Sequence, residues 1–136
     1  MHAYVDAQDG SPKVVIKISG TKRKTHKEIA ALLDTGHNGS LSLSILDLIE
    51  IGAKLSSFGP VGLADGSNVT VYYFTVKVEL DGNTKEVQAS MIENPKITEA
   101  IVGLELLSPY IAFIDFKNKK IQLSTEEQLK KDLAKK

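Results

Sequence analysis

The sequence of 136 residues contains no cysteine and has no excess of charge of either sign. Without cysteine there is no disulfide framework, no thiolate zinc site and no thiol nucleophile. Its 17 Lys and Arg residues balance 17 Asp and Glu residues, whereas gripping nucleic acid or an anionic membrane needs a basic excess. The three histidines, His2, His26 and His37, are too far apart in sequence for a compact metal motif. We therefore expect no metal and no cofactor, and neither nucleic acid nor a membrane as partner.

Long hydrophobic runs are missing as well. No run reaches the length that a membrane-spanning helix needs. Residues 1–15 contain Asp6 and Asp9 and lack the apolar core of a signal peptide, so we expect a cytoplasmic protein. The length and composition are those of one globular domain. We expect this domain to span residues 1–136, with a core at about 14–123 and a helical tail at 124–136.

Alternation with a period of two is the dominant pattern, and residues 14–18 are one example of a half-buried strand. Two Asp-Gly pairs, at 65–66 and 81–82, predict tight hairpin turns because Asp-Gly supplies the positive φ angles that such turns demand. Between them, residues 68–80 predict a long strand, covered on both faces in its first half and on one face in its second. Most of the expected strands are too short for an open sheet to bury its own apolar face. The expected elements together therefore predict a mainly β, closed, barrel-like fold.

Shorter segments complete the prediction. The apolar residues 28–33 leave strand or helix open. The basic residues 20–27 predict a solvated hairpin tip rather than a nucleic-acid patch, because no aromatic side chains interleave with the charges. The other expected elements are a strand at 40–44, a helix at 45–51 between Ser44 and Gly52, a helical turn at 104–107, a hairpin of 111–116 with 120–123, and a helix at 125–136 capped by Thr125.

Asp34 is the candidate for chemistry, because it follows an apolar run and precedes Thr35 and Gly36. A carboxylate beside a core is costly unless backbone N–H groups solvate it or a second carboxylate shares a proton with it. Such a pair holds one proton and can act as base and acid together. The ionised member takes a proton from water, while the protonated member donates to the carbonyl under attack. This chemistry needs no nucleophilic side chain, metal or cofactor.

The context of Asp34 carries a family resemblance. The segment Ala31-Leu32-Leu33-Asp34-Thr35-Gly36 is followed by a small-residue strand at 40–44, a glycine-containing hairpin at 59–71, and the apolar-apolar-Gly element of residues 100–107. In this order the chain resembles the retropepsin-like aspartic proteases, over about residues 14–123. It is most similar to the small prokaryotic, notably archaeal, members. The resemblance implies a closed barrel with a flap hairpin and one or two short helices, to which this chain adds the C-terminal helix expected from its own sequence.

The resemblance also implies roles for particular residues. Asp34 would be the catalytic aspartate of an endopeptidase that cleaves peptides or unfolded proteins as a homodimer. Thr35 would hydrogen-bond across the dimer, and Gly36 would offer its backbone N–H to the carboxylate. The residues implied for the flap that closes over substrate are Leu63, Ala64, Asp65, Gly66 and Ser67. Those implied to support the active-site loop are Ile101, Val102 and Gly103, the last packing directly against it.

The chain also departs from the family pattern. His37 stands in the loop where the family often has Ala or Ser. Its imidazole either favours ionisation of the carboxylate pair through its charge, or points outward and has no role. The turn at residues 93–96 and the C-terminal helix have no counterpart in viral members. We therefore do not assume that the dimer is held by the sheet that viral members form from their chain termini. The alternative function is a peptide-binding module of the same fold with weak or no catalysis.

Overall fold

The structure, a computed structural model, describes residues 2–21 and 25–135. Residues 22–24, in the predicted polar turn, lie outside the described part. The described strands are β1 (Ala3–Val5), β2 (Pro12–Gly20), β3 (His26–Leu33), β4 (Leu41–Leu43), β5 (Lys54–Gly62), β6 (Asn68–Leu80), β7 (Asn83–Met91), β8 (Ala100–Val102), β9 (Ile111–Asp115) and β10 (Lys120–Ser124). The helices there are α1 (Ile45–Glu50), α2 (Leu104–Leu107) and α3 (Glu126–Ala134).

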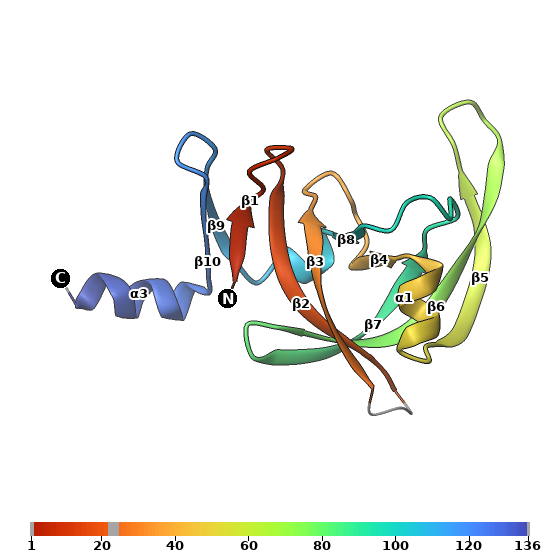
Figure 1. The fold of residues 1–136 in the computed structure, drawn as a ribbon, viewed down its shortest axis with the longest axis horizontal. Helices are drawn as coiled ribbons and strands as arrows, with labels where there is room; N and C mark the ends of the chain where they lie inside the picture. Colours follow the sequence, from red (N-terminus) through yellow and green to blue (C-terminus); the bar gives the residue numbers. More distant parts are fainter. Residues whose placement is uncertain (1, 22–24, 136) are drawn as a thin grey trace.

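Six of these strands close into a barrel, which confirms the predicted fold class (Figure 1). Around the ring the order is β2, β3, β8, β4, β7 and β6, and β6 pairs with β2 again to close it. The β3–β8 and β4–β7 pairs are parallel, while the other four are antiparallel. A closed ring leaves no open sheet edge, so short strands are enough to build it.

The sheet continues beyond the barrel at both ends. On one side β2 pairs with β1, then β10 and finally β9, so β9 is the last strand of the order. On the other side β5 pairs with β6, and their far halves project from the barrel as a long hairpin (Figure 1). This hairpin, the loop after β3 and the β9–β10 hairpin all point to the same side of the molecule, at the top of Figure 1.

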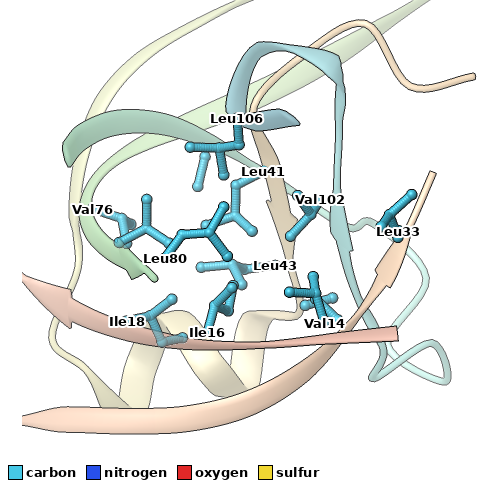
Figure 2. Close-up of a cluster of buried hydrophobic side chains, with 14 of the residues drawn as sticks. Val14, Ile16, Ile18, Leu33, Leu41, Leu43, Val76, Leu80, Val102 and Leu106 are labelled. Atoms are coloured by element: carbon cyan, nitrogen blue, oxygen red, sulfur yellow. The ribbon is translucent and has the colours of Figure 1, made fainter. Parts of the chain in front are cut away.

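The barrel interior is filled by alternate side chains of its strands (Figure 2). In β2, Val14, Ile16 and Ile18 are buried while Lys17 between them is exposed. Each aliphatic side chain taken out of water in this way contributes roughly 1.5–3 kcal/mol. The other buried members shown in Figure 2 include Leu33, Leu41, Leu43, Val76, Leu80, Val102 and Leu106.

The long strand β6 is predicted correctly in its second half and wrongly in its first. In the second half Val76, Val78 and Leu80 are buried on one face and Lys77 is exposed. The first half was expected to be covered on both faces, yet its side chains are half-buried or exposed, Tyr72 by 38%. The reason is that this half leaves the barrel and pairs with β5 in the projecting hairpin, where no second layer covers it.

The basic turn also differs from its prediction at one end. Lys27 was assigned to a solvated hairpin tip, but it lies in β3 and forms ion pairs with Asp47 at 2.7 Å and Glu50 at 2.6 Å. The hydrogen bond to Asp47, and then that to Glu50, raise the pKa of Lys27. Lys27 therefore connects α1 to the barrel, because its partner Asp47 lies 20 residues further along the chain.

The remaining elements agree with the sequence pattern apart from two strands. Residues 28–33, left open as strand or helix, form part of β3. Ser44 caps α1 by accepting a hydrogen bond from the Asp47 N–H, and Thr125 forms a capping box with Gln128 at α3. The sequence analysis missed β1 and the first half of β5. Strand β1 has only three residues, and the first half of β5 is exposed and contains two serines, so neither shows a run of apolar alternation.

Candidate active site

Asp34 lies at the point where β3 leaves the barrel. The parallel pairing of β3 with β8 sets Leu33 opposite Val102, and the Asp34 N–H continues this ladder by donating to the Val102 carbonyl at 3.0 Å. Leu33 and Val102 are buried in the core, whereas Asp34 is half-buried. The carboxylate therefore stands at the rim of the core, held by strand geometry rather than by its own side chain.

The next residues fold back onto the Asp34 carboxylate. The Gly36 N–H donates to Asp34 Oδ1 at 2.9 Å, and the His37 N–H donates to the Asp34 carbonyl at 3.2 Å. A Cβ atom at Gly36 would lie 3.2 Å from Asp34 Oδ1, which is closer than most side chains tolerate. Glycine thus permits the close approach through which a backbone N–H stabilises the negative charge.

Thr35 is exposed at the edge of this turn. It borders an apolar hollow of about 260 Å³ between the turn, α2 and β9. The hollow's other lining residues include Leu33, Leu104, Ala112 and Ile114. Thr35 therefore faces a surface that the described part of this single chain leaves uncovered.

The residues expected to support the loop lie beneath it. Ile101 and Val102 belong to β8, which pairs with both β3 and β4. Gly103 follows them, and its N–H donates to the Ser40 carbonyl at 2.9 Å. A Cβ atom at Gly103 would lie 2.2 Å from the Gly39 carbonyl oxygen and 2.6 Å from that of His37. The backbone of the loop therefore rests directly on Gly103, and no larger residue fits there without a shift.

The His37 side chain does not point outward. It is half-buried, and Nε2 lies 3.2 Å from the Ser42 hydroxyl of β4. Ser42 in turn lies 2.6 Å from the Ser90 hydroxyl of β7. Ser90 was not among the residues that the sequence analysis selected. The parallel register that sets Ser42 opposite Ser90 carries no local sequence signal, so only the assembled barrel reveals it.

The predicted flap residues form the tip of the projecting β5–β6 hairpin. All five, residues 63–67, are exposed. The Leu63 N–H donates to the Ser67 carbonyl at 2.7 Å, and Gly66 has a φ of +86°, as its Asp-Gly turn requires. The Ser67 hydroxyl and then its N–H donate to Asp65, and these hydrogen bonds hold the pKa of Asp65 below its ordinary value.

Two further findings concern metal binding and membrane-spanning helices. Across residues 2–21 and 25–135, no group of three or more His, Cys, Asp or Glu side chains is placed to hold a metal ion. None of the helices in that part of the chain is long and apolar enough to cross a membrane.

Comparison with known proteins supports the fold assignment. No protein-family profile matches the chain, and no curated protein is significantly similar to it in sequence. Among solved structures, the chain is similar to the retroviral EIAV protease, solved in complex with the inhibitor HBY-793. The match has a TM-score of 0.53 and 19% sequence identity, and it covers 76% of this chain and 90% of the protease. The closed barrel with its projecting hairpin is therefore a retropepsin-like fold.

Proposed function

We propose that the chain is an aspartic endopeptidase whose two catalytic carboxylates are Asp34 residues of two identical subunits. The observation that carries this proposal is the Asp34 turn itself. The barrel holds it through Val102, and the Gly36 N–H points at its carboxylate, within a retropepsin-like fold. Gly103 beneath the turn lets the loop backbone pack closely, which fixes the position of Asp34.

The proposed chemistry requires a second carboxylate. These 136 residues contain one Asp-Thr-Gly sequence, so they supply one catalytic carboxylate of this kind. A two-fold axis that brings Asp34 of another copy beside the first supplies it, because closed two-fold dimers are the commonest oligomers. Each subunit then contributes half of one active site.

The structure offers a surface for that second copy. Strand β9 ends the sheet order, so one of its edges has no partner strand among the described residues. Its neighbourhood exposes apolar side chains, 54% of Phe113 and 59% of Phe116. The apolar hollow beside Thr35 adjoins the same strand, and the β9–β10 hairpin points to the same side as the Asp34 turn. A partner on this side covers apolar surface and approaches Asp34 at once.

The reaction follows from a proton shared by the two carboxylates. The ionised Asp34 takes a proton from a bound water, whose oxygen attacks the peptide carbonyl carbon. The protonated Asp34 donates its proton to the carbonyl oxygen, giving a tetrahedral diol. Collapse of the diol breaks the C–N bond, and a proton passes to the leaving nitrogen. The products are a carboxyl and an amino terminus, and the pair again holds one proton.

The substrate class follows from the flap hairpin, residues 59–71. An extended peptide adds as a strand between this hairpin and the Asp34 turn. The projecting β5–β6 hairpin exposes Phe58, Val61 and Leu63, and the Phe58 and Tyr72 rings lie 6.1 Å apart. We therefore propose apolar side chains on both sides of the cleaved bond. The likeness to prokaryotic members, the cytoplasmic location and the absence of a nucleic-acid partner stay predictions of the sequence analysis.

Cleavage of unfolded casein and of a peptide library at several acidic pH values tests the proposal. Asp34→Asn removes base and shared proton together, so cleavage falls by orders of magnitude while the fold persists. Asp132→Asn, the same change on the exposed helix α3, serves as the matched control and keeps full activity. Residual Asp34→Asn activity within a few-fold of wild type contradicts the proposal. Peptide binding without cleavage by the wild type would favour the binding module instead.

A further inference from the structure

The imidazole of His37 is the unusual group beside the Asp34 turn. It follows Gly36 directly, yet it turns inward and reaches Ser42 on β4. The ring also covers Gly103, where an added Cβ would lie 2.5 Å from His37 Cδ2. Its other close neighbour is Gly39, whose Cβ position lies 3.3 Å from His37 Nε2. The ring is thus packed between the loop that carries Asp34 and the start of α2.

The backbone of His37 joins the same elements. Its N–H donates to the Asp34 carbonyl at 3.2 Å, and its carbonyl accepts from the Leu104 N–H of α2 at 2.8 Å. His37 therefore contacts Asp34 through its backbone and strand β4 through its side chain, and Ser42 extends this contact to Ser90 of β7. Movement of the ring would be transmitted to the Asp34 turn through a single residue's backbone.

The hydroxyl chain behind the ring can form in either direction. With a neutral imidazole whose Nε2 is unprotonated, Ser90 donates to Ser42 and Ser42 donates to Nε2. With Nε2 protonated, the order reverses, and Nε2 donates to Ser42 while Ser42 donates to Ser90. The Ser42–Ser90 distance of 2.6 Å fits both arrangements. The hydrogen bonds from His37 to Ser42 and from Ser42 to Ser90 can therefore form with either a neutral or a charged imidazole.

We infer that His37 is a positioning residue, which holds the catalytic turn in place through the chain His37–Ser42–Ser90. This inference rests on the proposed peptidase function, since the turn that it positions carries Asp34. His37 itself exchanges no proton with substrate. Misplacing a catalytic group by about 1 Å can cost on the order of 100-fold in rate, so a positioning contact affects turnover more than substrate binding.

Steady-state kinetics of His37→Ala test the inference. We expect kcat to fall about tenfold while KM stays within about twofold of wild type, because the loss falls on alignment rather than on uniform binding. His37→Gln, whose side-chain amide can still bond Ser42, should restore most of kcat. Ser42→Ala should reproduce the loss of His37→Ala. His26→Ala, which removes an exposed histidine of β3, is the matched control and leaves both constants unchanged.

A second readout does not depend on activity. Amide hydrogen exchange at Gly36, measured by NMR, should speed up at least several-fold in His37→Ala and stay at the wild-type rate in His26→Ala. Unchanged exchange together with unchanged kcat overturns the positioning role. If the wild type cleaves nothing, the proposed function fails, and exchange alone then decides whether His37 holds the turn.

Discussion

Two turns of this protein share a local design and differ in what surrounds them. In the Asp34 turn the Gly36 N–H donates to Asp34 Oδ1 at 2.9 Å, and in the flap tip the Ser67 N–H donates to Asp65 Oδ1, also at 2.9 Å. Asp34 is half-buried and its turn is bonded to β8 and α2, whereas Asp65 is exposed and its hydrogen bonds among the described residues lie within its own hairpin. The same short-range hydrogen bond thus occurs in a turn that is fixed against the barrel and in an exposed hairpin tip.

The comparison shows that the two aspartates differ in what surrounds their turns and not in the turns themselves. An aspartate that accepts one N–H two residues on is an ordinary turn former. Asp34 differs because its turn is held against Gly103 from below and by His37 from the side. A fixed carboxylate can be aligned with a second one, while an exposed hairpin tip can open and close over a substrate.

Among substitutions that alter one of these two turns, Gly103→Ala, beneath the Asp34 turn, is expected to have the largest effect. The added Cβ meets the carbonyl oxygens of Gly39 and His37, which are backbone atoms and cannot rotate away. We expect a loss of roughly 1–3 kcal/mol in the free energy of unfolding, measured by urea denaturation, and a loss of turnover with it. Gly59→Ala is the control, because its Cβ meets nothing within 4 Å and should leave stability unchanged or slightly higher. Equal stability of the two variants would contradict the close packing described.

A smaller effect is expected at the flap tip from Gly66→Val. A β-branched residue at a φ of +86° is strained, and it hinders the tight turn that the tip needs. Turnover should fall while the circular dichroism spectrum stays near native, because the tip is exposed and projects away from the barrel. Kinetics identical to wild type would show that this hairpin is not the lid.

The smallest expected effect concerns the pH dependence of the flap tip. The hydrogen bonds from Ser67 lower the pKa of Asp65, so the ionised turn is fully favoured above the ordinary Asp value and is lost as pH falls through the lowered one. NMR titration of Asp65 should therefore give a pKa below that of an unstructured peptide, and Ser67→Ala should raise it. A measured Asp65 pKa at or above the ordinary value would contradict the hydrogen bonds described at the tip.

Sequence patterns predicted much of this architecture, because local rules determine much of it. Turn chemistry places the hairpins at Asp65 and Asp81, and the side chains of Ser44 and Thr125 mark where helices begin. The alternation of β2 and of the second half of β6 follows from a barrel with one inner face. The expected closed barrel followed from these strands, and it is confirmed.

Other features depend on tertiary pairing that no local pattern contains. The projecting half of β6 is as apolar as a buried strand, so its sequence does not reveal that it leaves the barrel. The inward orientation of His37 depends on Ser42 and on the space above Gly103, which lies 66 residues further along the chain. Ser90 joins the site only through the parallel β4–β7 register. The catalytic roles of Asp34, Thr35 and the flap residues stay predictions until activity is measured.

Subunit mixing tests the central claim most directly, because a shared site cannot survive the replacement of one of its halves. Wild-type protein is mixed with an equal amount of Asp34→Asn, and mass spectrometry of isotopically labelled chains establishes that subunits have exchanged. Random exchange leaves each wild-type chain with a wild-type partner half of the time, so activity should fall to about half of the value before mixing. A larger excess of Asp34→Asn should lower it further in proportion. If activity instead stays at the level of the wild-type chains alone after exchange, the two Asp34 carboxylates do not form one catalytic pair.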